Sequence, residues 1–310
     1  MIYEFALEPA LVATWGKQLE YRYFYEKFGL GQPRIISQYP EKVKWRQQVL
    51  EAASEIRDLE KSRIEELLKR LSEEMISREG YSYDGNIAWL ENAEKEDQRC
   101  QFYAILALSN PTNHRRVLIG LELSQNDDPR WQLKDEEVVA RNAGDMANIV
   151  APMLTNCSEA LFIDPHFRPD QSRYQRPLEL FLKGLMKDRR VHPMPTRIEV
   201  QTSDDYSAEH FKSKCGKCLP RIIPQGIRIL IKRWKQNEAG QRLHNRYILT
   251  DIGGVRFATG LDENRDDPNG DTDEVSLLRR ETYTNRWAQY AGPSPAFELA
   301  EEPITIVGKA

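Results

Sequence analysis

The chain has 310 residues, of which 30% are charged and 40% hydrophobic, and its mean hydropathy is -0.65. That length accommodates one large domain or two modest ones. No stretch approaches the roughly 20 apolar residues of a membrane span. Four cysteines do not suggest a disulfide scaffold, and the first residues carry acids without a basic leader, so we expect a cytoplasmic protein.

The first part of the chain predicts mostly helix. Residues 1–9 favour a short strand, and residues 41–79 carry an apolar stripe at helical spacing. That helix is unusually long, so we expect one break or a partner helix, with packing into the chain's own core as the other use of the stripe. Residues 102–108 and 117–123 predict a β-hairpin or two neighbouring strands. We therefore expect a mainly helical region with a β-hairpin over 1–130, serving as an interaction module for a companion protein.

The second part predicts a layered sheet. A helix is expected over residues 136–154, capped by Asp135. Short apolar runs then alternate with helical segments, which is typical of an α/β domain and places that domain at 131–292. Residues 293–310 are expected to be a loosely held tail. The expected strands are 160–163, 198–202, 227–231, 247–250, 255–258 and 275–278, and the expected helices are 178–186, 208–219 and 281–290.

Charge is unevenly distributed along the chain. Residues 168–250 hold 18 Lys and Arg against 8 Asp and Glu, whereas residues 1–167 hold 20 against 28 and residues 251–310 hold 6 against 12. A basic segment of this kind suits a polyanionic substrate. The alternative is that solvated helix faces in this region happen to be basic.

One motif in the basic segment carries recognisable chemistry. The run HNRYILTD places His244 and Arg246 two residues apart, so an extended strand directs both side chains to one side. A guanidinium binds the non-bridging oxygens of a phosphate, while an imidazole attacks phosphorus or moves a proton. Asp251 follows the strand beside Gly253-Gly254, where it can fix loop backbone. This grouping predicts a phosphate site.

The spacing His-x-Arg-x4-Asp resembles the HKD signature of the phospholipase D superfamily. That resemblance implies a phospholipase-D-like α/β fold and metal-independent phosphodiester cleavage through a phosphohistidine, without a cofactor. It gives His244 the role of nucleophile or acid, Arg246 that of phosphate clamp, Asp251 that of loop anchor and Glu274 that of the carboxylate orienting the histidine. Arg246 stands where the family has Lys, and ATGLDEN stands where it has a Gly-Ser step. The alternative is that His244 is a histidine at a strand edge whose hydrogen-bonding partner is Asp251 or Glu274.

Other side chains are candidates for contact with substrate. His166 and Arg168 follow the strand at 160–163, so they either line a cleft at the carboxyl ends of the strands or belong to an ordinary turn. Asn245, Thr259 and Asn264 are further expected substrate contacts.

Two further segments leave alternatives open. Cys215 and Cys218 form a lone CxxC, which is either half of a zinc site or a pair of ordinary thiols. We expect no metal. The acidic loop at 262–274 is expected to be solvated, or to shield the basic cleft.

The motif occurs once. His114, His166 and His210 each begin a similar pattern, but none has an Asp five residues after the basic position. Since the family's reaction uses two histidines, the resemblance implies a homodimer or a hetero-pair with a second phospholipase-D-like chain. The basic segment and the lack of a membrane span favour nucleic acid (DNA or RNA) as substrate, as in an antiviral defence effector of bacteria. The alternative is a catalytically inactive nucleic-acid-binding or scaffold subunit of a larger complex.

Overall fold

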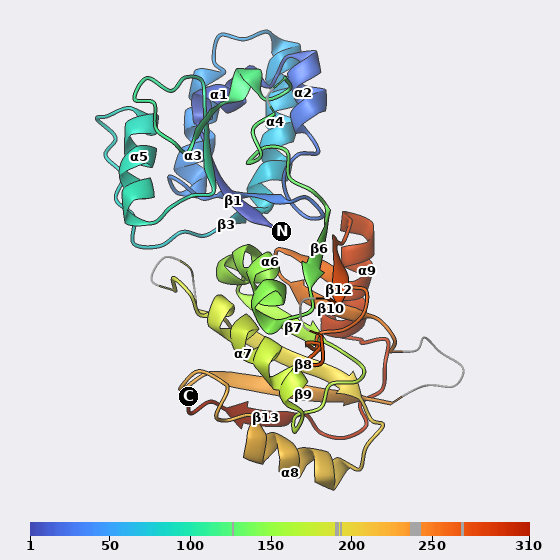
Figure 1. Ribbon diagram of the computed structural model, residues 1–310. Coiled ribbons are helices and arrows are strands. Elements are labelled where there is room, and N and C mark those ends of the chain that lie inside the picture. The colour runs from blue at the N-terminus through green and yellow to red at the C-terminus, as the bar shows by residue number, and fades with distance from the viewer. Residues whose placement is uncertain (126, 190–191, 193, 236–242, 268–269) are drawn as a thin grey trace. The chain divides into compact units, whose positions relative to one another are not determined.

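The chain divides into two compact units, each built on its own β-sheet (Figure 1). The computed structural model describes residues 1–125, 127–189, 192, 194–235, 243–267 and 270–310. We call residues 2–134 the N-terminal unit, and residues 135–189 with 194–310 the C-terminal unit. The protein is therefore of the mixed α/β class, and each unit is described by itself.

The N-terminal unit contains a five-stranded parallel sheet in the order β3-β2-β1-β4-β5. Its central strands consist of consecutive buried residues, as expected where helices cover both faces of a sheet. The chain builds outward from β1 to β3 and then returns to the other side of β1. The strands are β1 (Tyr3–Leu7), β2 (Arg34–Ser37), β3 (Met75–Ile76), β4 (Ala104–Ala107) and β5 (Val117–Ile119).

Helices cover both faces of this sheet. Phe5 and Leu7 of β1 belong to a large core with α1, α3 and α4, while Ala6 faces a smaller core with α5. This alternation along one strand is what separates the two layers. The helices are α1 (Pro9–Thr14), α2 (Gln18–Phe24), α3 (Lys42–Ala52), α4 (Asp58–Glu73) and α5 (Trp89–Arg99), with a 3-10 turn at Gly120–Glu122.

Two expectations for this unit need correction. The β-hairpin predicted from 102–108 and 117–123 is wrong, whereas the alternative of two neighbouring strands is confirmed, because β4 and β5 pair in parallel, with Leu106 opposite Leu118. The turn residues between the strands form a crossover loop instead. The break expected in the helical stretch 41–79 is confirmed, because α3 ends at Ala52 and α4 begins at Asp58 and packs against α3. The region predicted to be mainly helical is thus organised by a buried sheet.

The C-terminal unit contains an eight-stranded mixed sheet in the order β13-β9-β8-β7-β10-β11-β12-β6. β7, β8 and β9 are parallel, whereas β10, β11, β12 and β6 continue antiparallel from β7. The strands are β6 (Glu136–Ala140), β7 (Glu159–Ile163), β8 (Arg197–Ser203), β9 (Arg228–Trp234), β10 (Arg246–Thr250), β11 (Gly253–Phe257), β12 (Thr272–Leu277) and β13 (Ile304–Val307).

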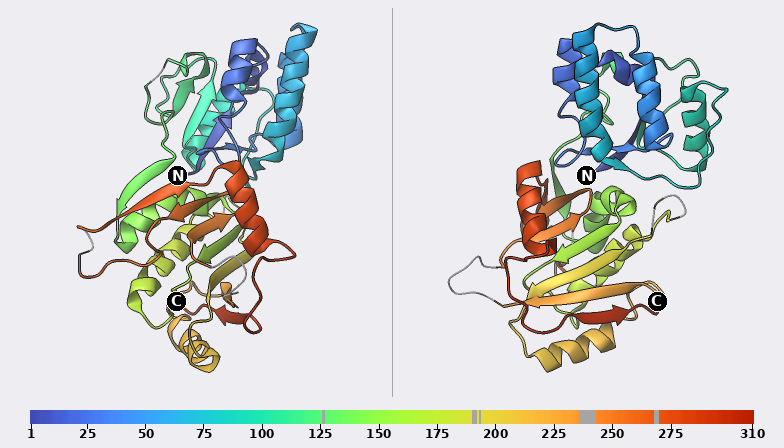
Figure 2. Two further views of the ribbon diagram at one scale, coloured as in Figure 1. Left: turned by 90° about the vertical axis from the view of Figure 1, so that its right-hand side faces the viewer. Right: turned by 180° about the vertical axis from the view of Figure 1, so that it is seen from behind.

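Helices pack on both faces of this sheet as well. On one face Phe181 of α7 lies between Phe162 of β7 and Phe257 of β11, and α6 packs beside α7. On the other face Tyr290 of α9 contacts Tyr247 of β10. α8 lies at the sheet end formed by β9 and β13 (Figure 2). The helices are α6 (Ala143–Asn156), α7 (Ser172–Leu185), α8 (Ala208–Cys218) and α9 (Arg280–Ala291).

Most strands predicted for this unit are confirmed, but its two ends are not as expected. The helix predicted from residue 136 begins only at Ala143, because β6 precedes it and Asn142 caps it by accepting a hydrogen bond from Asp145 N. The tail predicted to be loosely held contains β13, which pairs with β9 along four residues. The unit begins at residue 135, not 131, and extends through 310.

Candidate phosphate-binding site

The HNRYILTD segment and the loop after β7 meet at one edge of the C-terminal sheet. β10 runs antiparallel to β7, so Tyr247 lies opposite Ile163 and the start of β10 adjoins the end of β7. β8 runs parallel to β7, and Asp164 N donates to Gln201 O across that pair. The start of β10 and the ends of β7 and β8 therefore build a common edge.

Arg246 is the first residue of β10 and is half-buried. Its Nη1 donates to His244 O at 3.0 Å, while its buried Nε has no hydrogen-bond partner among the described residues. No carboxylate within the described residues forms an ion pair with it. A guanidinium in this state retains most of its capacity to bind an anion. His244 precedes the strand and is exposed.

Asp164 joins the loops around this edge. It is 2% exposed; Oδ1 accepts from His166 N at 2.9 Å and Oδ2 accepts from Leu261 N at 2.8 Å. Burial raises the pKa of Asp164, the charge of Asp262 raises it further, and the nearby Arg246 acts in the opposite direction. Asp164 therefore fixes the positions of the two loops that flank Arg246.

Arg168 provides a second cation at this edge. Its guanidinium carbon lies 3.2 Å from the ring centroid of Tyr206, a residue in the loop after β8. Its buried Nη1 has no hydrogen-bond partner, and it takes part in no ion pair among the residues described. His166, two residues earlier, is exposed. The edge thus presents two guanidinium groups without carboxylate partners.

Nearby arginines are, by contrast, occupied by the acidic loop. Arg141 forms ion pairs of 2.9 Å with both Asp262 and Asp271. Arg173 lies 3.5 Å from Asp262, and Arg176 lies 3.2 Å from Glu263. These contacts hold the described part of the loop against the body of the unit.

Glu274 does not lie where a histidine-orienting carboxylate is required. The strand register places Arg246 beside Phe257 and Phe257 beside Val275 on one face, so the preceding residue, Glu274, points to the opposite face. Glu274 is exposed there. Its neighbour Asp273 faces the side of Arg246 and is buried, accepting from Thr259 N at 3.0 Å and Gly260 N at 3.3 Å. The assignment of Glu274 is therefore corrected, because strand alternation turns it away from the site.

Asp251 lies at the other end of β10 from His244. Its carboxylate accepts from Ser158 N at 2.9 Å and from Glu159 N at 3.0 Å, which fixes the loop leading into β7. At about 3.4 Å per residue, the five steps from Arg246 to Asp251 cover roughly 17 Å, and His244 lies two residues further away. Asp251 thus anchors backbone at a distance from the edge that carries Arg246.

The remaining sequence-predicted residues divide into two groups. Asn245 lies between His244 and Arg246 at the edge itself. Thr259 is exposed beside the Asp273 carboxylate, whereas Asn264 is engaged within the acidic loop, where its Oδ1 accepts from Asp266 N and Asp267 N. Asn264 is consequently positioned to shape that loop.

Sequence reasoning missed three residues of this region: Asp164, Tyr206 and Asp273. Asp164 was available as the acid that ends a buried strand, and Asp273 as the neighbour of the carboxylate that was chosen. No local pattern distinguishes Tyr206, since its role depends on a contact with Arg168 across the sheet edge.

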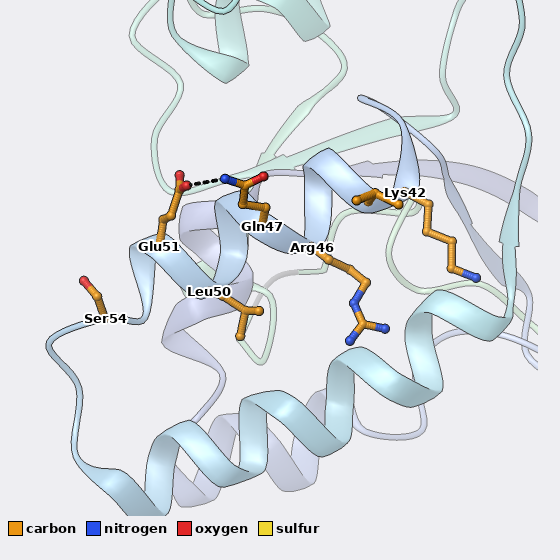
Figure 3. Close-up of a pocket in the computed structure, with 7 residues that line it drawn as sticks. Lys42, Arg46, Gln47, Leu50, Glu51 and Ser54 are labelled. Atoms are coloured by element: carbon orange, nitrogen blue, oxygen red, sulfur yellow. Dashed lines mark hydrogen bonds between the residues drawn. The ribbon is translucent and has the colours of Figure 1, made fainter.

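The N-terminal unit has features that the motif does not explain. Glu8, directly after β1, accepts a hydrogen bond from Leu108 N after β4 at 2.6 Å, at the point where the strand order reverses. Burial raises the pKa of Glu8. An open hollow of about 660 Å³ follows the exposed side of α3, and Lys42, Arg46 and Leu50 line it (Figure 3). A second hollow, of about 350 Å³, is lined by α2 and residues 120–124.

Within the described parts of the chain, no three His, Cys, Asp or Glu side chains are grouped to hold a metal ion, and Cys215 and Cys218 are free thiols. Each described helix is too short or too polar to cross a lipid bilayer.

Comparison with known proteins gives distant likenesses only. No family model matches the chain, and no curated protein matches it. A phospholipase D family member, Nuc from Salmonella typhimurium, aligns with 54% of this chain and 98% of its own, at 8% identity and a TM-score of 0.33. TrmBL2, an archaeal chromatin protein, aligns with 79% of this chain and 86% of its own, at 12% identity and a TM-score of 0.28. Scores this low do not establish a common fold, so the functional assignment depends on the site itself.

Proposed function

We propose that the protein is a metal-independent phosphodiesterase acting on nucleic acid, in which two chains each contribute one His244 to a shared site. The observation that carries this proposal is the pair of guanidinium groups without carboxylate partners, Arg246 and Arg168, beside an exposed histidine. Guanidinium groups that have no carboxylate partner favour the binding of an anionic ligand. The HKD-like spacing of His244, Arg246 and Asp251 supports a phosphodiester in particular.

In this mechanism Arg246 binds the non-bridging oxygens of the phosphate and stabilises the charge that develops on them. His244 of one chain attacks phosphorus, forming a P–N bond while the P–O bond to the leaving group breaks. The second chain's His244 donates a proton to that leaving oxygen and then accepts one from water, which hydrolyses the phosphohistidine. Asp251 acts only by holding the backbone at the far end of β10.

Cleavage of a fluorescent oligonucleotide in the presence of EDTA tests this proposal. We expect activity in EDTA, and we expect His244→Ala to reduce it at least a thousandfold because the nucleophile is lost. His210→Ala is the matched control, since His210 is an exposed histidine on α8 and should leave the rate unchanged. Activity that EDTA abolishes would contradict the mechanism, as would activity that His244→Ala leaves intact.

The requirement for two chains has a separate test. When wild-type protein is exchanged with an excess of His244→Ala, every mixed pair has one histidine, so activity should fall with the square of the wild-type fraction. A fall in simple proportion to that fraction would show that one chain suffices.

A catalytically inactive nucleic-acid-binding protein is the second candidate. The orientation of Glu274 favours it, because no carboxylate of the described residues contacts the His244 ring. Arg246 favours it too, since arginine binds phosphate but is a poor proton donor. Oligonucleotide binding without cleavage, unaffected by His244→Ala but weakened by Arg246→Ala, would select this candidate.

A further inference from the structure

Tyr206 is an exposed aromatic residue fixed beside the phosphate-binding edge. It lies three residues after β8 and is 42% exposed. Arg233, which is 3% exposed and ion-paired with Glu301 at 2.6 Å, donates from Nη2 to Tyr206 O. The backbone at Tyr206 is therefore held by a buried side chain of β9.

The side chain of Tyr206 is in contact with Arg168. The Arg168 guanidinium lies against the ring at 3.2 Å from its centroid, and Arg168 has no ion pair among the described residues. A cation on one face of a tyrosine ring is attracted by the ring's electrons and limits its movement. With 42% of the residue exposed, Tyr206 combines a fixed position with access to solvent.

The strand that leads to Tyr206 lies near the strand that begins with Arg246. β8 is two strands from β10 in the sheet, which is roughly 10 Å at the usual strand spacing. The loop after β7, which carries Arg168, lies between them, and its Pro165 O accepts from Ser203 N at the end of β8. A ligand extending from Arg246 toward the end of β8 therefore crosses the loop that carries Arg168.

We infer that Tyr206, backed by Arg168, is a subsite on which a base of a single-stranded nucleic acid stacks when a neighbouring phosphate lies at Arg246. This inference rests on the proposed function, and it specifies the substrate class as single-stranded. A base in a duplex has both of its faces covered by its neighbours, so only an unstacked base offers a face to the ring.

Binding of two matched oligonucleotides tests the inference by fluorescence anisotropy. One probe is a ten-residue deoxythymidine strand, and the other is an abasic strand with the same number of phosphates. We expect Tyr206→Ala to weaken binding of the thymidine strand about tenfold and to leave abasic binding unchanged. Tyr206→Phe keeps the ring and should bind both strands as the wild type does.

Several outcomes separate this inference from the proposed function. If Tyr206→Ala affects neither probe, or weakens both equally, while Arg246→Ala weakens both, the stacking subsite is wrong and the phosphate site stands. If the wild type binds neither probe, both are wrong. If Tyr206→Ala discriminates between the probes but no cleavage occurs in EDTA, the subsite stands and catalysis does not. Equal thermal unfolding midpoints for Tyr206→Ala and wild type show that the variant is folded.

Discussion

Arg78 of the N-terminal unit and the pair Arg246 and Arg168 of the C-terminal unit differ in their partners. In the N-terminal unit Arg78 is fully buried and donates to Glu4 at 2.9 Å, to Glu96 at 2.6 Å and to Cys100 O. In the C-terminal unit Arg246 and Arg168 are partly buried at a sheet edge, and neither has a carboxylate partner among the described residues. Arg78 has the contacts of a structural ion cluster, whereas Arg246 and Arg168 leave guanidinium groups for the anionic ligand that we propose. The presence or absence of carboxylate partners, more than local charge, distinguishes Arg78 from Arg246 and Arg168.

Loss of Arg78 should give the largest effect on stability. Arg78→Met leaves Glu4 and Glu96 buried without a cation, and we expect the free energy of unfolding to fall by about 3–5 kcal/mol. Urea denaturation measures this change. Adding Glu4→Gln and Glu96→Gln should recover part of the loss, because the uncompensated charges are then removed. A fall below about 1 kcal/mol for the single variant would mean that Arg78 is not a structural residue.

Loss of Arg246 should affect binding and spare stability. Because a hydrogen bond to a charged group contributes about 1.5–3 kcal/mol, Arg246→Ala should weaken oligonucleotide binding roughly 10- to 100-fold. The free energy of unfolding should change by less than about 1 kcal/mol. Arg256→Ala is the matched control: Arg256 is an exposed arginine on the neighbouring strand that faces the other side of the sheet. Equal losses of binding in the two variants would mean that general surface charge, and not a specific site, accounts for oligonucleotide binding.

Asp164 should give the smallest effect, and its sign is determined by burial. Burial raises the folded-state pKa of Asp164 above its ordinary value of 3.8, so the folded protein holds that proton more tightly than the unfolded chain does. The cost of ionising Asp164 is absent below pH 3.8 and complete above the folded pKa. The unfolding free energy of the wild type, relative to Asp164→Asn, should therefore rise as pH falls from 7 toward 4. Parallel pH profiles for the two proteins would show that the Asp164 pKa is not raised.

Local pattern predicted the sheet that carries the site better than the sheet of the N-terminal unit. The run of Ala160–Ile163 and the pair of strands around Gly253-Gly254 are confirmed because apolar strand segments bounded by turn residues are encoded locally. The parallel pairing of β4 with β5 could not be predicted from local pattern. Two apolar runs separated by turn residues fit a hairpin and a parallel crossover equally, and only the rest of the N-terminal sheet decides between them.

In the candidate site, too, some residues could be predicted from the sequence and others could not. The spacing of His244 and Arg246 placed both at one edge, since strand alternation follows from sequence. Glu274 faces away from Arg246, because neighbouring residues of a strand point to opposite faces of the sheet. The partnership of Arg168 with Tyr206 joins two loops 38 residues apart in the sequence, so no spacing within either loop predicts it.

The strand order of the C-terminal unit also has a consequence for synthesis of the chain. β6, its first strand, pairs only with β12, and β9 acquires its outer neighbour only when β13 has formed. As the chain leaves the ribosome, β9 and, once it has formed, β11 are therefore edge strands until residues 304–307 and 272–277 are available to pair with them. Exposed strand edges of this kind pair readily with other chains. Nascent chains of this protein should thus depend on chaperones most strongly late in translation. At that stage β7, β8 and β9 are complete, but β12 and β13 have not yet paired with β11 and β9.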